Sequence, residues 1–464
     1  MRVHFIGIGG IGVSALAQFF LSIGHDVSGS DLVSSEITEN LKKKGIKIFI
    51  GKQKKENLKK DLSLVVYSPA IKKDNPEFRE AKKRKILIQS YPEALGELTK
   101  KYFTIAVSGS HGKSTTTAML SLILIKAGLD PTVILGTKLK EFGDSNFRVG
   151  DFPKSEICNL KSKILVIEAD EHFASFLNYW PKIIVLTNIE REHLDYYKNL
   201  KNILKTYKEY LSHLKKDGIL VLNKDCGNVC QVSQKIKNKK FYSIKQKEAK
   251  KIKKILKIPG DHNISDALAA LTVARVLKIP DKVSFKALSE YKGAWRRFEI
   301  IKIKLTDNLE PRTCTLISDY GHHPTKVRVT LKAAREKYPK KKIWLVYQPH
   351  QYQRTYYLFN DFVQVFKNAL RPVQQTHRRQ VQGKPSVDNL IITDIFDVAG
   401  REEKIIKNKV SSEKLVRAIN DKKTVYVPTI EKTFTYLKKN LKGGEVVIIM
   451  GAGDIYKLVD YFIK

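Results

Sequence analysis

Two glycine-rich turns, each between an apolar run and a helical pattern, constrain the fold of this chain most. The first turn runs from Gly7 to Gly12, and the second runs from Ser108 to Thr117. Glycine lets backbone N–H groups approach phosphate oxygens, and the helix that follows points its positive end at them. A strand–turn–helix unit of this kind is typical of a parallel α/β sheet. We therefore expect an α/β protein that binds two phosphorylated ligands.

The rest of the chain repeats the same alternation of apolar runs and helical patterns. The first block carries predicted strands at 3–8, 27–30, 65–67 and 86–88, with a helix over 13–23. The second block carries predicted strands at 103–107, 164–167, 183–186 and 219–222, with helices at 115–127, 200–214 and 265–277. The third block carries predicted strands at 315–317, 343–347, 390–393, 424–427 and 446–450. A chain of 464 residues is too long for one ordinary core, so three α/β domains in series are predicted.

The first turn has the spacing Gly-x-Gly-x-x-Gly, formed by Gly7, Gly9 and Gly12. Asp31 ends the next predicted strand, near the position at which dinucleotide-binding folds place a ribose-binding carboxylate. The pattern suits a dehydrogenase as well as any other nucleotide-binding protein. A tight turn without a ligand is the alternative.

The second turn contains the sequence Gly-Ser-His-Gly-Lys-Ser over residues 109–114. It is not a complete Walker A motif, because Val107 stands where that motif has its first glycine. A lysine for the β- and γ-phosphates is present as Lys113, and a hydroxyl for Mg²⁺ is present as Ser114. We therefore expect this turn to bind ATP with Mg²⁺.

Acidic and polar residues follow two strands of the second block. Glu168 to His172 follow the strand at 164–167, and Thr187 to Asp195 follow the strand at 183–186. Carboxylates at the carboxyl ends of strands in an open α/β sheet lie at the ligand crevice, where they can hold Mg²⁺ against phosphates. Each stretch alone is equally consistent with a polar loop that caps a helix. Together they favour a metal–phosphate site.

Four further motifs have both a functional and a plain structural interpretation. His262-Asn263 precedes an alanine-rich helix, where an asparagine can simply be the N-cap. Arg296-Arg297 can clamp a phosphate or lie in a solvated turn. The histidine pair in the stretch 319–325 can belong to a site at a strand end or lie at the surface of a turn. Arg354 can bind a carboxylate or form a surface ion pair.

The charge and cysteine content bear on partners and compartment. The formal net charge is +38, but lysines occur in every segment and no aromatic–basic motif accompanies them. We therefore attribute the positive charge to the general use of lysine on the surface. Binding to nucleic acid stays open as the alternative explanation. The four cysteines, Cys158, Cys226, Cys230 and Cys314, are irregularly spaced. This spacing favours reduced thiols in a cytoplasmic protein.

Two segments need separate interpretation. The apolar stretch 3–23 contains glycines, His4 and Gln18, which favour a strand–turn–helix over a signal peptide or a membrane anchor. No other segment approaches the ~18 apolar residues of a membrane span, so no membrane insertion is expected. The stretch 371–389 lacks periodicity and is interpreted as an inserted surface loop, with disorder favoured over a functional role.

Taken together, the order of these motifs resembles the Mur ligases of peptidoglycan synthesis. The resemblance covers nearly the whole chain, from the turn at 7–12 to Gly451-Ala452-Gly453. It implies an N-terminal Rossmann-like domain for a UDP-linked substrate at 1–98, a central P-loop ATPase domain at 99–297, and a C-terminal Rossmann-like domain for an amino acid at 298–464. The implied reaction joins L-alanine to the carboxylate of UDP-N-acetylmuramate with ATP and Mg²⁺, through an acyl phosphate.

The resemblance also implies roles for individual residues. The expected contacts to the UDP-linked substrate are Gly9, Gly10, Ile11, Gly12, Asp31 and Ser68. The expected contacts to ATP are Gly109, Ser110, His111, Gly112, Lys113, Ser114, Thr115, Asn263, Arg297 and Asp319. The expected magnesium ligands are Ser114, Glu168 and His193, and the residues expected near the incoming amino acid are His323, His350 and Arg354. Of all these, Lys113, His193, His323 and Arg354 are expected to act in catalysis.

Several positions depart from the family pattern, among them the run 170–173 and Ser318, and three other functions remain as alternatives. Asp266 stands where the family usually has a second asparagine, and Gln351 stands where it usually has arginine. The related ligase that attaches a tripeptide during cell-wall recycling is the first alternative. An NAD-dependent oxidoreductase would use the first turn and Asp31, but it leaves the Lys113 turn unexplained. A basic P-loop protein that binds nucleic acid is the third.

Overall fold

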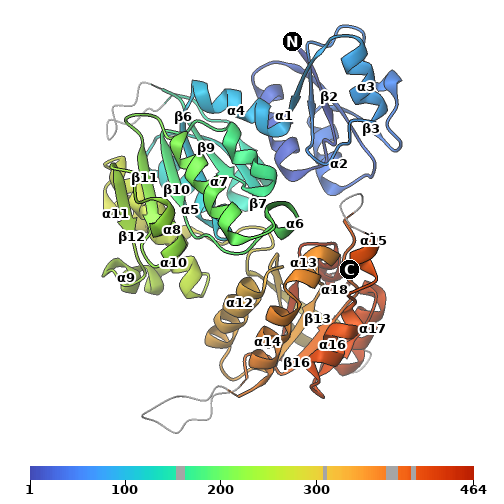
Figure 1. The fold of residues 1–464 in the computed structure, drawn as a ribbon. Coiled ribbons are helices and arrows are strands. Elements are labelled where there is room, and N and C mark those ends of the chain that lie inside the picture. The colour runs from blue at the N-terminus through green and yellow to red at the C-terminus, as the bar shows by residue number, and fades with distance from the viewer. Residues whose placement is uncertain (153–161, 307–310, 373–384, 399–403, 464) are drawn as a thin grey trace. The chain divides into compact units, whose positions relative to one another are not determined.

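Three separate β-sheets organise the chain in the computed structural model, which describes residues 1–152, 162–306, 311–372, 385–398 and 404–463 (Figure 1). The three sheets confirm the predicted three-domain α/β class. By its contacts the chain divides into two units. The first unit contains residues 1–190, 201–255 and 265–291, and the second contains residues 191–200, 256–264 and 292–464. The predicted boundaries after residues 98 and 297 remain predictions.

The N-terminal sheet is parallel throughout, with the strand order β3-β2-β1-β4-β5. Its strands are β1 (Arg2–Ile6), β2 (Asp26–Asp31), β3 (Lys47–Ile50), β4 (Leu64–Tyr67) and β5 (Leu87–Ser90). The helices are α1 (Ile11–Ser22), α2 (Glu36–Lys43), the 3-10 helix η1 (Lys55–Asn57), α3 (Pro76–Lys83) and α4 (Tyr91–Lys101). The strand order reverses beside β1, so the first glycine turn lies at the point where this type of fold binds its ligand.

The central sheet contains seven strands in the order β12-β11-β10-β6-β9-β7-β8. The strands are β6 (Phe103–Ser108), β7 (Thr132–Leu139), β8 (Ser145–Arg148), β9 (Ile164–Ala169), β10 (Ile183–Leu186), β11 (Ile219–Asn223) and β12 (Lys239–Tyr242). The helices of this region are α5 (Lys113–Lys126), η2 (Lys140–Phe142), η3 (His172–Asn178), α6 (Leu194–Tyr197), α7 (Leu200–Ser212), α8 (Gly227–Val232), α9 (Glu248–Ile255), α10 (Asp261–Val276) and α11 (Asp281–Glu290). The β7–β8 hairpin is the antiparallel edge of an otherwise parallel sheet.

The C-terminal sheet has the order β13-β14-β18-β15-β16-β17 and is parallel except for the β13–β14 pair. The strands are β13 (Glu299–Thr306), β14 (Pro311–Asp319), β15 (Ile343–Tyr347), β16 (Asn389–Ile392), β17 (Thr424–Tyr426) and β18 (Val446–Met450). The helices are α12 (Pro324–Lys337), α13 (Tyr352–Tyr357), α14 (Phe359–Leu370), α15 (Lys404–Lys407), α16 (Ser412–Ile419), α17 (Ile430–Asn440), η4 (Ile455–Lys457) and α18 (Leu458–Ile463). Central strands such as β15 and β18 are buried along their whole length, as continuous apolar runs covered on both faces require.

The structure changes some sequence predictions. The sequence pattern did not reveal β3, β7, β8, β12 or β13. Glu168 lies within β9 rather than after it, because the strand continues to Ala169. His262 and Asn263 do not precede their helix, because α10 already begins at Asp261. Asn263 is therefore a first-turn residue and not an N-cap.

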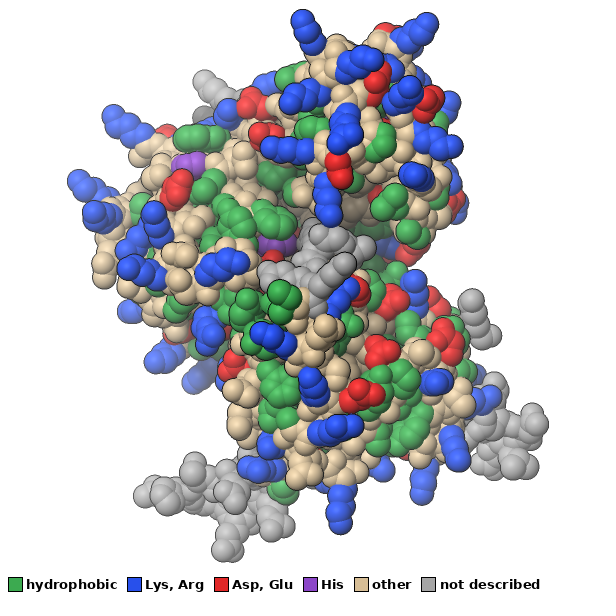
Figure 2. Space-filling view, turned by 45° about the vertical axis from the view of Figure 1, so that its right-hand side comes forward, with side chains coloured by type: hydrophobic (Ala, Val, Ile, Leu, Met, Phe, Trp, Pro, Cys, Tyr) green, Lys and Arg blue, Asp and Glu red, His purple; other side chains and the backbone are tan. Residues whose placement is uncertain are grey.

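Other sequence interpretations concern the surface. Figure 2 shows Lys and Arg side chains scattered over the visible face, with acidic side chains between them. Among the described residues, no helix combines the length and the apolar character that crossing a bilayer requires. Of the predicted loop 371–389, residues 373–384 lie outside the described residues, as does Cys158, whereas Cys226, Cys230 and Cys314 are free thiols.

Candidate active site

The first glycine turn is tied to the end of β2 through its backbone. The amides of Gly7 and Ile8 both donate to the main-chain oxygen of Ser30, at 2.8 and 3.1 Å. Gly7 has φ +78°, a conformation that side-chain-bearing residues rarely adopt. The turn therefore leads from β1 into α1 with its shape set by the neighbouring strand.

Asp31 and Ser68 both lie against this turn. A carboxylate oxygen of Asp31 accepts the amide of Gly9 at 2.8 Å. Ser68 follows β4, donates its own amide to the oxygen of Ile6 at 2.9 Å, and lies where a Cβ on Gly7 would come within 3.0 Å of it. The structure thus brings Asp31 and Ser68 to the turn, as the sequence predicted for a site built around it.

The second glycine turn is held by the segment that follows β10. The amide of Ser110 donates to the oxygen of Asn188 at 3.0 Å, and the amide of His111 donates to the Asn188 side chain at 2.8 Å. In return, the hydroxyl of Ser110 accepts the amide of Glu190 at 2.9 Å. Gly112 has φ +84°, and a Cβ there would lie 2.3 Å from a carboxylate oxygen of Asp266. The turn is therefore fixed before any ligand arrives, which lowers the cost of binding a phosphate chain.

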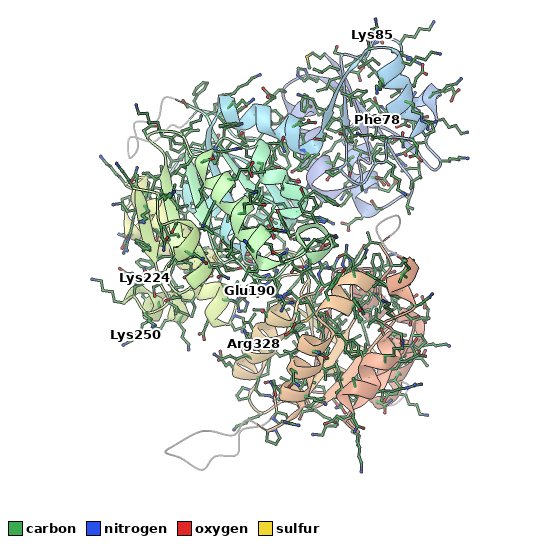
Figure 3. The ribbon with its side chains drawn as sticks, viewed as in Figure 1. Phe78, Lys85, Glu190, Lys224, Lys250 and Arg328 are labelled. Carbon is green, nitrogen blue, oxygen red and sulfur yellow. The ribbon has the colours of Figure 1, made fainter. Side chains whose placement is uncertain are left out.

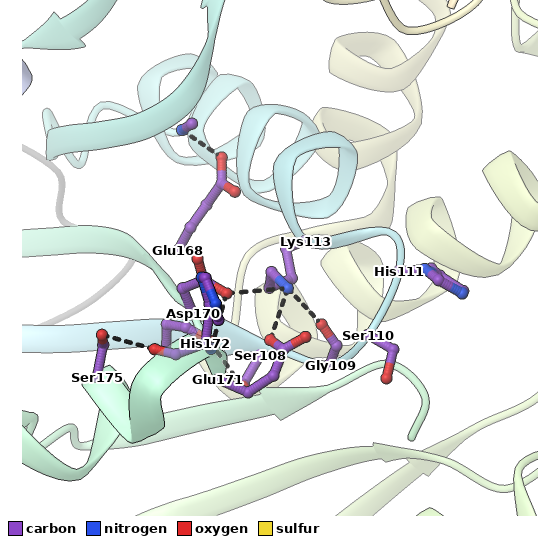
Figure 4. A network of polar contacts seen from close by, with 12 residues as sticks. Ser108, Gly109, Ser110, His111, Lys113, Glu168, Asp170, Glu171, His172 and Ser175 are labelled. Atoms are coloured by element: carbon purple, nitrogen blue, oxygen red, sulfur yellow. Dashed lines mark hydrogen bonds and ion pairs between the residues drawn. The ribbon is translucent and has the colours of Figure 1, made fainter. Parts of the chain in front are cut away.

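Lys113, the first residue of α5, lies among acidic and carbonyl oxygens (Figure 4). Its ammonium donates to Glu171 and to the oxygen of Gly109, each at 2.7 Å, and lies 3.6 Å from Asp170. Burial would lower the pKa of Lys113, but the carboxylates of Glu171 and Asp170 outweigh it and raise that pKa. Burial also raises the pKa of the Glu171 carboxyl to about 7, against the opposing effect of Lys113. Lys113 is thus a charged donor next to the turn.

Ser114, the residue after Lys113 in α5, forms a hydrogen bond with Glu168. The Ser114 hydroxyl donates to Oε2 of Glu168 at 3.0 Å, and Oε1 of Glu168 accepts the amide of Gly136 on β7 at 2.5 Å. A hydroxyl and a carboxylate side by side are the hard oxygen ligands that Mg²⁺ prefers. Glu168 therefore fits the predicted metal role together with Ser114. Thr115 is buried in the same first turn of α5.

In the second unit, Asp319 ends β14 and holds two backbone amides. One of its carboxylate oxygens accepts the amide of Phe298 at 2.9 Å, and the other accepts that of Gly321 at 2.8 Å. The Arg297 guanidinium lies 4.7 Å from the ring centre of Tyr320. Asn263 donates its side-chain amide to the oxygen of Pro259 at 2.5 Å. These three residues belong to the second unit, whereas Lys113 belongs to the first.

Arg354 on α13 forms a buried ion pair. Its Nε donates to Glu192 at 2.8 Å, and the two side chains are 8% and 4% exposed. Its guanidinium also lies 3.0 Å from Nδ1 of His350 and donates to the His350 oxygen at 3.2 Å. Burial would raise the pKa of Glu192, but Arg354 and His323 outweigh it and hold that pKa well below its ordinary value. The surface ion pair considered for Arg354 is therefore a buried one.

A small pocket opens beside this ion pair, within the second unit. It gathers residues from the segment before α6 and from α13, namely Arg191, Glu192, His193, Leu194, Asp195, Gln351, Arg354, Tyr357 and Leu358. The pocket thus contains two predicted site residues, His193 and Arg354, together with Gln351, the residue that departs from the family pattern. His323 approaches the same segment, because its Nε2 lies 3.2 Å from the oxygen of Arg191.

Sequence reasoning missed two acidic residues at these sites. Glu171 was noted only as part of an acidic run, and Glu192 was noted only as part of the stretch 187–195. Each is buried against a predicted site cation, Lys113 or Arg354. The sequence indicated them only as members of acidic runs. It could not pair them with Lys113 and Arg354, because these partners lie 58 and 162 positions away.

Three family models match successive parts of the chain. Residues 2–103 match the model described as Mur ligase family, catalytic domain. Residues 107–274 match the Mur ligase middle domain, and residues 296–453 match the model described as Mur ligase, glutamate ligase domain. Together the three matches cover most of the chain.

Curated relatives and solved structures agree with these matches. The chain is 38% identical to a UDP-N-acetylmuramate--L-alanine ligase of Acetivibrio thermocellus, over 100% of this chain and 96% of the relative. It is also 38% identical to the enzyme of that name from Aquifex aeolicus, over 100% and 97%. A UDP-N-acetylmuramate-alanine ligase from Thermotoga maritima has a similar structure, with a TM-score of 0.77, 25% identity, and coverage of 100% and 98%. A murein peptide ligase from Psychrobacter arcticus shares the fold, with a TM-score of 0.69 at 21% identity.

Proposed function

The chain belongs to the Mur ligase family, and we propose that it joins L-alanine to UDP-N-acetylmuramate in the synthesis of peptidoglycan precursors. The reaction is an ATP-dependent amide ligation. The observation that carries this proposal is the Lys113 turn in a chain that matches L-alanine-adding relatives along its whole length. The substrates UDP-N-acetylmuramate and L-alanine come from the names of those relatives.

The substrate-binding end is proposed to be the first glycine turn. Gly9, Gly10, Ile11 and Gly12 lead into α1, whose N-terminal amides favour the diphosphate of a UDP-linked substrate. Asp31 accepts the amide of Gly9 and so supports the turn. Asp31 and Ser68 are also proposed to contact the UDP-linked substrate, because a carboxylate that accepts one amide keeps further acceptor sites.

In the first chemical step, a carboxylate oxygen of the muramic acid attacks the γ-phosphorus of ATP, and the bond from that phosphorus to the β-phosphate oxygen breaks. The products are an acyl phosphate and ADP. Attack by one anion on another is slow unless positive charge lies close to both. Lys113 supplies such a charge, and the turn amides add donors around it. Ser114 and Glu168 would hold Mg²⁺, which would supply additional positive charge at the phosphates, and His193 of the second unit stays a predicted ligand.

In the second step, the amine of L-alanine attacks the acyl carbon, phosphate leaves, and the nitrogen loses a proton. Arg354 is proposed to bind the carboxylate of the amino acid through its fork of N–H donors, with His350 and His323 nearby. Gln351 contributes a neutral side chain to the same pocket.

The remaining assignments are also proposals. Asn263, Arg297 and Asp319 are proposed to serve the nucleotide on the side of the second unit. Free thiols at Cys226, Cys230 and Cys314 fit a reducing compartment, so we propose a cytoplasmic enzyme. No nucleic-acid partner is proposed.

The test is release of inorganic phosphate by the purified full-length chain with Mg²⁺, ATP and UDP-N-acetylmuramate. L-alanine, glycine, L-serine and the cell-wall tripeptide are supplied in separate assays. We expect L-alanine to give the highest kcat/KM, with an amide product of matching mass. Turnover with the tripeptide alone would assign the chain to the recycling reaction instead, and NADH binding without UDP-sugar binding would favour an oxidoreductase.

A further inference from the structure

A closed set of buried and part-buried hydrogen bonds lies next to the first glycine turn. We propose that Glu77, at its centre, is a positioning residue that holds the turn in the shape that binds the diphosphate of the UDP-linked substrate. This inference rests on the proposed function and adds to it a residue that touches neither substrate.

Glu77 lies in the first turn of α3 and is completely buried. Its Oε2 accepts the hydroxyl of Ser30 at 2.6 Å, and its Oε1 accepts the side-chain amide of Asn57 at 2.5 Å. Nε2 of His4, which is also completely buried, lies 3.3 Å from Oε2. Figure 3 labels Phe78, the next residue along α3, and so locates this helix in the N-terminal domain.

A ring of hydrogen-bond donors and acceptors is formed by Ser30, Glu77, Asn75 and Gln53. The Ser30 hydroxyl donates to Glu77, and the backbone amide of Glu77 donates to Asn75 at 2.9 Å. The side-chain amide of Asn75 donates to Gln53, and the amide of Gln53 donates back to the Ser30 hydroxyl at 3.3 Å. These bonds link the end of β2 to the first turn of α3, and a side-chain network of this kind restricts how far Ser30 can move.

The ring reaches the glycine turn through Ser30. The side chain of Ser30 is a member of the ring, while its main-chain oxygen accepts the amides of both Gly7 and Ile8. The next residue, Asp31, accepts the amide of Gly9. The position of the end of β2 therefore determines where three consecutive turn amides point. Glu77 holds that end in place through its hydrogen bond with the Ser30 side chain.

Core stability alone explains this arrangement poorly. A buried carboxylate is costly to desolvate, and apolar residues of similar volume often stabilise a core equally well or better. Glu77 nevertheless keeps a carboxyl group at a position without solvent exposure. One of its hydrogen bonds goes to Ser30 at the end of β2, the strand that carries the turn contacts, as expected of a positioning residue. Its other side-chain contacts are with Asn57 and with His4 on β1.

The main test is the variant Glu77→Gln in the full-length enzyme. Glutamine keeps the size of the side chain but places an amide donor against the donating side chain of Ser30 or Asn57. We expect the KM for UDP-N-acetylmuramate to rise about tenfold, as the turn amides lose their alignment. The kcat and the KM for ATP are expected to stay within about twofold, because the ring lies in the domain of the N-terminal sheet and the Lys113 turn follows a strand of the central sheet. A merely structural role would lower the thermal midpoint without this selective change in KM.

The matched control is Glu80→Gln on the same helix. Glu80 forms an ion pair with Arg84 at 2.7 Å, at the edge of the domain and outside the ring. Its loss is expected to leave every kinetic constant unchanged. A second variant, Ser30→Ala, removes one hydroxyl from the ring, keeps the main-chain oxygen that holds the turn, and covers the case in which Glu77→Gln does not fold.

Direct binding of UDP, measured by calorimetry without ATP or amino acid, separates this inference from the proposed function. If the wild-type chain forms no amide with L-alanine but Glu77→Gln binds UDP about tenfold more weakly, the ligase assignment fails and the positioning role stands. If folded Glu77→Gln and Ser30→Ala both bind UDP as tightly as the wild type, the inference is overturned. It is also overturned if the wild-type chain binds no UDP.

Discussion

The ammonium of Lys113 lies 2.7 Å from the carboxylate of Glu171, whose side chain is only 2% exposed. The sequence predicted that Lys113 contacts the phosphates of ATP, and the structure adds an acidic partner within the protein. A lysine held beside a buried carboxyl group has its position set before any ligand binds, as stabilisation of charge in a transition state requires.

Replacing Lys113 with alanine is expected to lower kcat at least about a hundredfold, because the variant loses the positive charge at the phosphates. The measurement is phosphate release with UDP-N-acetylmuramate and L-alanine. Lys126→Ala is the control, since Lys126 lies at the last turn of the same helix and pairs with Glu290 at the surface. A folded Lys113→Ala enzyme with near-normal turnover would remove the central premise of the mechanism.

The contact between Ser114 and Glu168 leads to a prediction about magnesium. In Ser114→Ala, the Mg²⁺ concentration for half-maximal activity is expected to rise about tenfold, while Ser114→Thr, which keeps a hydroxyl, is expected to change it little. Ser121→Ala is the matched control, because Ser121 is buried in the same helix and its hydroxyl bonds only within that helix. Titration of activity with Mg²⁺ after treatment with EDTA gives the result. Equal midpoints for all variants would exclude Ser114 as a ligand.

Arg354 is expected to govern the affinity for the amino acid. Lysine keeps the charge but not the fork of donors, so Arg354→Lys is expected to raise the KM for L-alanine at least about tenfold and to leave the KM for ATP unchanged. Tyr356→Phe, at an exposed position of the same helix, is the control. If the KM values for ATP and L-alanine rise equally, Arg354 does not bind the amino acid selectively.

The pH dependence of stability is expected to depend on His262. Burial lowers the pKa of His262 from 6.5 to about 4, against the opposing effect of Asp319. Between these values the unfolded chain binds a proton that the folded chain does not, so the free energy of unfolding falls as the pH drops from 6.5 towards 4. His262→Gln is expected to reduce this loss.

Urea unfolding of the wild type and of His262→Gln, each at pH 7.5 and pH 5, tests the prediction about His262. We expect the wild type to lose more stability than the variant between these two conditions. Identical losses would show that His262 is not the titrating group.

Local pattern was enough to predict the two glycine turns, because a strand, a turn and a helix in succession are specified by neighbouring residues. The strands at 183–186, 343–347 and 446–450 were predicted with the bounds that the structure has. Their apolar runs are continuous because they lie in the middle of their sheets. The same clarity was lacking for β7 and β8, which form an edge hairpin.

Motif order and local pattern were enough to identify the family, the α/β class and the residue types at each strand end. Which of these residues meet depends on how distant segments pack: Gly136 of the edge hairpin contacts Glu168, Arg354 contacts Glu192, and Glu77 contacts Ser30 at the end of β2. Such pairs join residues separated by 32, 162 and 47 positions. Local sequence periodicity cannot predict these pairs, because burial and hydrogen bonding between distant segments depend on how the sheets and helices pack.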